Sequence, residues 1–486
     1  MESCRSGWCA IVFFPGWVCF ATVVLPVANY GNEPAADSIS RCNVLMICID
    51  DLNDWTGFLG GHPQAATPHM DALARRGRVF ANAHCAVPVC SASRISVLSG
   101  VAPTTHGSYE LGPRYEELPS LLEVPTMHGY FRQHGYTTIS GGKVLHHGFQ
   151  GRLAADIDQS LGRPMNPSPP RPLHRPSHWH RAWDWGPFPV DDEAMGDYQL
   201  AVQAARLLRE EGFDSPFLMS VGFYRPHVPL CVPAHWFDDY PIEHVRLARI
   251  VEDDLSDVPP NFRDLNRFLA APTHAEVLAA DCERELTQAY LASIRFVDHC
   301  VGKLVEALDS GPYADHTYIV LWSDHGFHLG EKWHWGKRTL WEESTRVPLL
   351  IVGPEIVPGE PCIEPVSLLD IYPTLVELCQ LSPNHWLEGE SLVPQLRDPH
   401  AVRHRPAIIS SYYGNHAVRD RDWRLIVYED GGEELYDHRS DPQELHNVVH
   451  DPLFRAVRER LMAWLPREAA PEFKAESERK GSGAEF

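Results

Sequence analysis

The segment Asn43-Val-Leu-Met-Ile-Cys-Ile-Asp-Asp51 joins an unbroken apolar run to two adjacent carboxylates. A short, continuously apolar run is typical of a strand that is buried on both faces of a parallel sheet. Ligands bind such sheets at the carboxyl ends of the strands, which is where Asp50 and Asp51 stand. Two neighbouring carboxylates repel each other unless a cation compensates for their charge. The segment alone is compatible with a metal site or with a solvated turn.

A second segment repeats this pattern. The apolar run Thr317–Trp322 predicts a strand, and Ser323-Asp324-His325-Gly326 follows it directly. Because carboxyl ends of parallel strands meet at one edge of the sheet, the two segments together predict a four-ligand metal site. Oxygen-rich ligation favours Ca²⁺ or Mg²⁺, while the histidine leaves Zn²⁺ or Mn²⁺ open. The expected ligands are Asp50, Asp51, Asp324 and His325.

Strand and helix signals alternate over more than 300 residues around these two segments. This order predicts an α/β fold with a large, mostly parallel sheet and helices on both faces. The expected helices are 68–77, a helix beginning at Cys90, 126–134, 198–211 and 284–308, and the further strands are 137–140, 217–223 and 348–352. Residues 150–190, rich in Pro, His and Trp, are interpreted as a long insertion that forms part of a substrate pocket.

The alternation stops after about residue 385, and short β-like runs follow. We therefore predict a catalytic domain over residues 41–384 and a small C-terminal antiparallel α+β subdomain over 385–470. Its expected strands are 407–413, 416–418, 423–428 and 434–436, and a closing helix covers 453–465. The charged, glycine-bearing tail 471–486 is predicted to be disordered.

Residues 1–30 read as a targeting segment, because Arg5 precedes a nearly uninterrupted apolar stretch. A signal peptide and export to a periplasmic, secreted or lysosome-like compartment are expected, with a retained anchor as the alternative. Pro15, Gly16 and Pro26 argue against a stable membrane span. The net charge of −23 excludes nucleic-acid binding by a broad basic surface. An anionic substrate would need a local cluster of cations.

Cys90-Ser-Ala-Ser-Arg94 follows a loop and opens a predicted helix. A helix N-terminus favours an anion, and Arg94, four residues further on, shares the face of Cys90. A buried inert cysteine beside a surface arginine is the alternative interpretation. A tyrosine-phosphatase loop is excluded, because its arginine would stand six positions after the cysteine, where this chain has Ser96.

These residues resemble the sulfatase signature Cys-x-Pro/Ala-Ser-Arg, and the family belongs to the alkaline-phosphatase superfamily. Further segments resemble sulfatases in family order: 43–51, 98–100, 106–107, 142–146, 221–229, 323–331 and, near the C-terminus, 434–447. Gly142-Lys-Val-Leu-His146 and Arg225-Pro-His-Val-Pro229, together with the Asp-His pair at 324–325, look most like the iduronate-2-sulfatase branch.

The resemblance implies a set of roles. A modifying enzyme would oxidise Cys90 to formylglycine, and the modified residue would join the four predicted ligands around one Ca²⁺, with Mg²⁺ or Mn²⁺ as lesser alternatives. Arg94 would steady the formylglycine hydrate. Lys143 and Lys337 would bind sulfate oxygens, and His146 and His227 would transfer protons or bind sulfate. The local departure is Lys332-Trp-His334, which leaves the role of His334 open.

The expected activity is hydrolysis of sulfate esters on a sulfated sugar or polysaccharide. A phosphodiester or phosphonate monoester hydrolase of the same superfamily is the nearest alternative, since it uses the same nucleophile. A non-catalytic protein that binds sulfated glycans is the alternative from a different class.

Overall fold

Strand β1 (Asn43–Asp50) forms the centre of the fold. The computed structural model describes residues 41–210, 212–260 and 271–474. In it β1 lies between β7 (Phe217–Pro226) and β9 (Thr317–Ser323) and runs parallel to both. All eight β1 residues are buried. Successive side chains point to opposite faces, and each face is covered by its own hydrophobic core. Burial on both sides explains why this strand is apolar without alternation.

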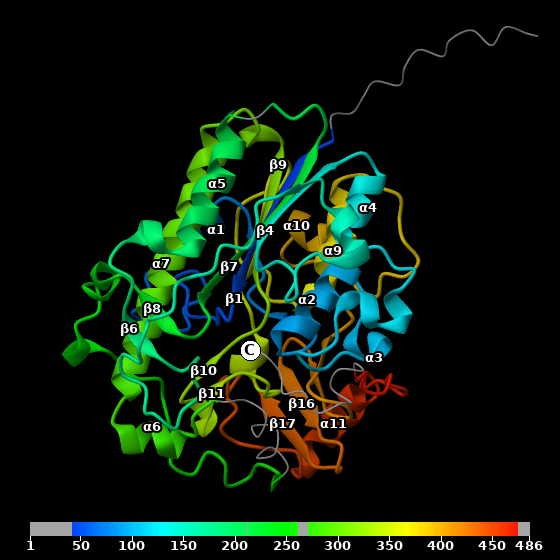
Figure 1. Cartoon of the computed structure of the whole chain (residues 1–486). Coiled ribbons are helices and arrows are strands. Elements are labelled where there is room, and N and C mark those ends of the chain that lie inside the picture. Colours follow the sequence, from blue (N-terminus) through cyan, green and yellow to red (C-terminus); the bar gives the residue numbers. More distant parts are fainter. Residues whose placement is uncertain (1–40, 211, 261–270, 475–486) are drawn as a thin grey trace, which may run out of the picture. The chain divides into compact units, whose positions relative to one another are not determined.

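The main sheet has seven strands in the order β2-β12-β9-β1-β7-β4-β5 (Figure 1). Its inner pairs are parallel, whereas β12 pairs antiparallel with both β9 and β2 at one edge. The strands not yet bounded are β2 (Arg78–Val79), β4 (Thr137–Gly142), β5 (Gln159–Ser160) and β12 (Leu349–Val352). The predicted α/β class with a mostly parallel sheet is confirmed.

Helices cover both faces of this sheet, as Figure 1 shows. On one face lie α1 (Pro68–Ala74), α5 (Gly196–Glu210) and α7 (Glu283–Asp309). On the other lie α2 (Cys90–Ser99), α4 (Met127–Gln133) and α9 (Ile371–Leu378). The shorter described helices are α3 (Pro103–His106), α6 (His274–Ala280), α8 (Glu342–Thr345) and α10 (Val393–Arg397). None of the described helices combines the length and apolarity that crossing a membrane requires.

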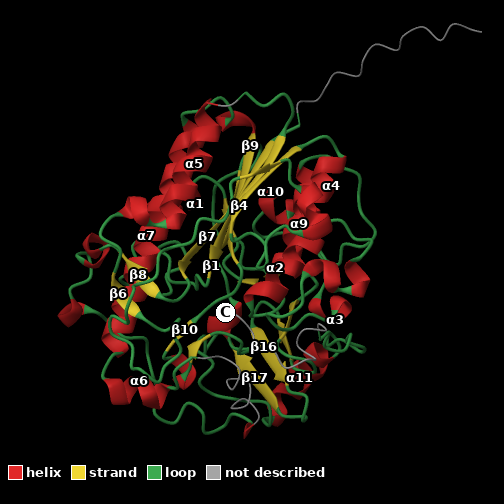
Figure 2. Ribbon diagram, in the orientation of Figure 1, coloured by secondary structure: helices red, strands yellow, loops and turns green. Residues whose placement is uncertain are grey.

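The C-terminal part forms a four-stranded antiparallel sheet with a closing helix (Figure 2). Its elements are β14 (Ala407–Ser410), β15 (His416–Arg419), β16 (Trp423–Val427), β17 (Glu433–Asp437) and α11 (Arg455–Met462). One face packs on α11 and the other on Leu340 and Trp341 from the larger part of the chain. The described residues all belong to one compact unit, so the predicted boundary between residues 384 and 385 stays a prediction.

The segment predicted as an insertion contains regular structure. Besides β5, it includes β6 (Trp185–Pro187), which pairs in parallel with β8 (Leu230–Val232). Within the main sheet β4 pairs with β5 over two residues. Two separate pairs of two-residue strands complete the described strands: β3 (Ala83–His84) with β13 (Val366–Ser367), and β10 (His328–Leu329) with β11 (Trp335–Gly336).

Both predicted chain ends fall largely outside the described residues. The signal peptide over residues 1–30 lies outside them, as do residues 475–486 of the predicted disordered tail. The four described residues of that tail are placed, since the Phe473 amide donates to the Gly107 carbonyl over 2.8 Å.

Candidate active site

Three predicted carboxylates meet at the carboxyl edge of the sheet. Asp50 ends β1 and Asp324 follows β9, and these strands are neighbours in register up to Ile49 opposite Ser323. Asp51 has a positive φ of 62°, and its amide donates to Asp324 Oδ1 over 3.1 Å. All three carboxylates are buried. The backbone reversal at Asp51 therefore holds its side chain beside those of the other two acids.

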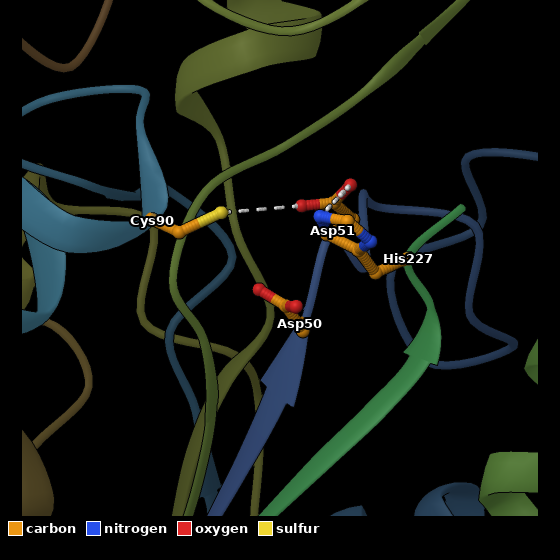
Figure 3. Close-up of side chains that lie close together, drawn as sticks. All are labelled: Asp50, Asp51, Cys90 and His227. Carbon is orange, nitrogen blue, oxygen red and sulfur yellow. Dashed lines mark hydrogen bonds and ion pairs between the residues drawn. The ribbon is translucent and has the colours of Figure 1, made fainter. Parts of the chain in front are cut away.

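Cys90 is the first residue of helix α2, and its thiol faces this cluster (Figure 3). The Sγ atom lies 3.2 Å from His325 Nε2, 2.9 Å from Lys337 Nζ and 3.8 Å from Asp51 Oδ1. Burial raises the pKa of the Cys90 thiol, but Lys143, Lys337 and His325 together outweigh burial and hold that pKa well below its ordinary value. The position thus stabilises a negative charge on the side chain at residue 90.

Arg94 lies one turn further along α2 and is fully buried. Its Nε donates to Asp324 Oδ2 over 2.9 Å and its Nη2 to Asp50 Oδ1 over 3.1 Å. A third contact reaches the Lys143 carbonyl. Arg94 therefore connects the two strand ends to the helix through their carboxylates. Burial alone would raise the pKa of Asp324, and it does so to about 7 despite the opposing charge of Arg94.

The two predicted lysines each contact one carboxylate of the cluster. Lys143 Nζ pairs with Asp50 Oδ2, and Lys337 Nζ lies 2.6 Å from Asp51 Oδ1. Burial raises the pKa of Asp50, but Lys143, His227 and Arg94 together outweigh burial and lower the pKa overall. Two glycines bring Lys143 to this position: a Cβ on Gly142 would lie 2.0 Å from the Gly222 carbonyl oxygen, and Gly142 has a φ of +70°. The close approach of β4 and β7 thus depends on both glycines.

The three predicted histidines surround the thiol and carboxylates from different loops. His325 Nδ1 bonds the Gly326 carbonyl (2.9 Å), which directs Nε2 toward Cys90. His227 Nδ1 bonds the Val228 carbonyl (2.6 Å), while Nε2 lies 3.9 Å from Asp51 Oδ2 and the side chain is 27% exposed. His146 lies beside Cys90, and burial lowers its pKa to about 4.

His334, whose role the sequence left open, contacts the backbone of Lys337. Its Nε2 bonds the Lys337 carbonyl over 3.0 Å, and the ring is buried against His328. Burial lowers the pKa of His334 to about 4, so it is a neutral ring at neutral pH. His334 therefore positions the lysine rather than facing the thiol.

The donor set fits a divalent cation. Ligand atoms lie within 4.8 Å of one another in two overlapping groups, Asp50-Asp51-Cys90-His227 and Asp50-Cys90-Asp324-His325. Asp51 Oδ2 is buried and has no hydrogen-bond partner among the described residues. Three buried carboxylates with an orphaned oxygen and an imidazole suit a hard cation such as Ca²⁺. His227 was not among the predicted ligands, and the structure adds it as a candidate.

A second acidic group has a structural explanation. Glu342, His438 and Glu444 also lie within 4.8 Å of one another. Arg424 contacts both carboxylates and Arg419 contacts Glu342. Because arginines already pair with its carboxylates, this group joins the C-terminal sheet to α8.

Taken together, the doubly covered sheet and the helix that places Cys90 beside strand-end carboxylates define a hydrolase of the alkaline-phosphatase superfamily. The sulfatase family model matches residues 42–381, and the model of the C-terminal region of N-sulphoglucosamine sulphohydrolase matches residues 330–470. The chain belongs to the sulfatase family and is a sulfuric ester hydrolase.

Three known proteins illustrate the relationship. A sulfatase of Formosa agariphila is 36% identical, over 88% of this chain and 87% of that protein. Iduronate 2-sulfatase of Homo sapiens is 29% identical, over 72% and 71% of the two chains. The crystal structure of phosphonate monoester hydrolase of Agrobacterium radiobacter superposes with a TM-score of 0.69 at 23% identity, covering 87% of this chain and 95% of that one. The last similarity concerns the fold alone.

Proposed function

We propose that this protein hydrolyses sulfate esters of a sulfated saccharide, as in the iduronate-2-sulfatase branch, through a formylglycine made from Cys90 by a modifying enzyme. The observation that carries the proposal is the position of Cys90 Sγ, at a helix start and within 4 Å of a lysine, a histidine and a strand-end carboxylate. The names of the relatives, sulfatase and iduronate 2-sulfatase, support the substrate class. Export by the N-terminal segment is part of the same proposal.

Asp50, Asp51, Asp324 and His325, with residue 90, would hold one Ca²⁺. When bound, the cation supplies Lewis acidity that polarises sulfate oxygens, and the hydrated aldehyde of formylglycine supplies the hydroxyl nucleophile. Arg94 ties two of these carboxylates together and keeps the ligand set in place. It is a positioning residue in this structure, since its guanidinium faces the carboxylates.

Lys143 and Lys337 would hold the nonbridging oxygens of the sulfate group. Both ammonium groups lie in the buried cluster, where charge–charge contacts are strong because little water screens them. Each is paired here with a carboxylate that would hold the cation, and both lysines would be available to sulfate oxygens when that site is filled.

The two histidines that line the cluster would divide proton transfer. His227 is partly exposed and its Nδ1 proton is fixed on a carbonyl, so Nε2 can face a leaving alcohol arriving from solvent. His146 lies inside, beside residue 90, where it would accept the proton of the attacking hydroxyl. Once the alcohol has departed, the second hydroxyl of residue 90 would lose its proton and expel the sulfate by breakage of the C–O bond, which restores the aldehyde.

Substitution of Cys90 tests the proposal. Cys90→Ala should abolish hydrolysis of an aryl sulfate while the fold and Ca²⁺ binding largely survive, and mass spectrometry of the active protein should find the Cys90 peptide as the aldehyde. An unmodified thiol in the native host would favour a non-catalytic glycan-binding protein, and full sulfatase activity in Cys90→Ala would contradict the mechanism.

The fold it shares with phosphonate monoester hydrolase makes that activity the second candidate. Parallel assays on an aryl sulfate and on an aryl phosphonate monoester separate the two. A higher kcat/KM on the phosphonate would replace the sulfatase proposal.

A further inference from the structure

One cation beside the site has no carboxylate partner among the residues that the structure describes. Arg163 is exposed, and its Nη2 donates to the His146 carbonyl over 2.9 Å and to the Tyr224 hydroxyl over 3.0 Å. The Tyr224 ring in turn lies 5.7 Å from Lys143 Nζ. The Arg163 guanidinium therefore lies on the solvent side of His146, which it contacts directly, and of Lys143, which it approaches through Tyr224; both residues belong to the proposed sulfate site.

Four other cations of this neighbourhood are paired with carboxylates, and Arg225, which donates to the Cys231 and His227 carbonyls, is buried. Lys143, Lys337 and Arg94 pair with the strand-end carboxylates, and Arg338 pairs with Glu110. Within the described part of the chain, Arg163 forms hydrogen bonds to neutral oxygens and no ion pair. Of these six residues, Arg163 is thus the one whose positive charge has no paired carboxylate and whose side chain is open to solvent, next to His146.

The segment that carries Arg163 has an unusual charge for this chain. Residues 159–183 contain four arginines and no acidic residue, giving +4, whereas the whole chain carries −23. An acidic protein repels a polyanionic substrate, so a local basic surface at the mouth of the site is needed to attract it. The four arginines are Arg163, Arg171, Arg175 and Arg181.

We propose that Arg163 binds a second anionic group of the substrate, a carboxylate or a further sulfate that neighbours the sulfate ester being cleaved. A guanidinium presents several N–H donors in one plane and matches the paired oxygens of either anion. Nη2 is anchored by the two neutral oxygens, whereas Nη1 and Nε donate to no described residue, so their N–H groups are available to an anion. Arg163 is then a specificity-determining residue that selects polyanionic saccharides over neutral ones. This inference rests on the proposed sulfatase function.

Matched substrates test it. The wild-type enzyme, Arg163→Gln and Arg163→Lys are compared on a neutral monosulfated sugar, a monosulfated uronic acid saccharide, its carboxyl-reduced form and a disulfated saccharide. Arg163→Gln should lose about tenfold in kcat/KM, mainly through KM, on an anionic substrate and nothing on the neutral one; tenfold corresponds to about 1.4 kcal/mol. Arg163→Lys should recover part of the loss. Whether the carboxylate or the second sulfate substrate is affected identifies the anion.

Arg181→Gln is the control, because it removes the same charge from the same basic segment at another exposed position. Equal losses in both variants, or equal losses on neutral and anionic substrates, would overturn the proposal. Calorimetric binding of the same saccharides to protein with unmodified Cys90 provides an arm that needs no turnover. If the wild-type protein and Arg163→Gln bind the anionic saccharides equally, Arg163 does not recognise these saccharides. If the wild-type enzyme does not hydrolyse sulfate esters, that result counts against the proposed function alone.

Discussion

Arg424 in the C-terminal sheet provides the most direct test of how the two parts of the fold hold together. It is fully buried, with Nε 2.6 Å from Glu444 Oε1, Nη1 2.7 Å from the Leu340 carbonyl and Nη2 3.0 Å from Thr345 Oγ1. Nη2 also contacts Glu342. Both terminal nitrogens of this guanidinium therefore donate to partners from other elements, and Nε lies in ion-pair contact with Glu444.

Arg424→Met keeps much of the volume but leaves two buried carboxylates without their shared cation. Removing one partner of a buried ion pair typically costs about 3–5 kcal/mol, because the remaining charge is left uncompensated. Glu342 retains Arg419 and Glu444 retains His438 at 2.9 Å, so we expect about 3 kcal/mol, the lower end. Activity should fall as well, since Ser411 at the end of β14 donates to the Arg338 carbonyl, one residue from Lys337.

Urea unfolding followed by circular dichroism measures this loss. Arg439→Met is the matched control: its ion pair with Asp437 lies on the same sheet, but Arg439 is exposed, so we expect a much smaller loss of unfolding free energy than for Arg424→Met. A second variant, Arg424→Met with Glu444→Gln, should recover part of the stability. If Arg424→Met lost no more than the control, the inference that this ion-pair group joins the two parts would be wrong.

Two further predictions concern acid and metal. Burial lowers the pKa values of the His106 and His128 rings to about 3, so only the unfolded chain gains these protons as the pH falls below 6.5. The free energy of unfolding should therefore decline toward pH 3 by about 1.4 kcal/mol per pH unit for each ring. His128→Gln, which keeps a bond to Ser220, should remove one ring's share of this slope, and an unchanged slope would refute the assignment. Removal of divalent cations with a chelator should lower the melting temperature and Ca²⁺ should restore it, with about 2.7 kcal/mol gained at 100 times the Kd; Asp51→Asn should shrink this response, and an equal response would exclude Asp51 as a ligand.

The sequence predicted the parts of the site that depend on strand order. Apolar runs ending in acids placed Asp50 and Asp324 on one sheet edge, because neighbouring parallel strands end together. The helix at Cys90 followed from its position after a loop, and the structure brings all predicted site residues into one cluster. Their catalytic and ligand roles remain predictions.

The contacts made by long side chains could not be predicted in this way. Sequence spacing did not reveal that Arg94 would bind two carboxylates, or that Arg163 from the insertion would reach the His146 carbonyl. Such contacts depend on which loops meet in three dimensions, and β5, which pairs with β4 at the sheet edge shortly before Arg163, lies in the segment that the sequence predicts as an insertion. A visible signal existed nevertheless, since the run of arginines without acids in residues 159–183 is unusual in an acidic chain.

The burial of Cys90 affects the order of events in the life of the chain. Its side chain is 1% exposed, at the start of a helix whose ten residues are all buried. A modifying enzyme would have to bind several residues around the thiol, and the folded protein exposes none of the residues of this helix. Under the proposed chemistry, oxidation must therefore precede folding, during or soon after synthesis. A molecule that folds before oxidation would keep its thiol and be inactive, so the specific activity of a preparation would report the fraction of molecules that were oxidised before they folded.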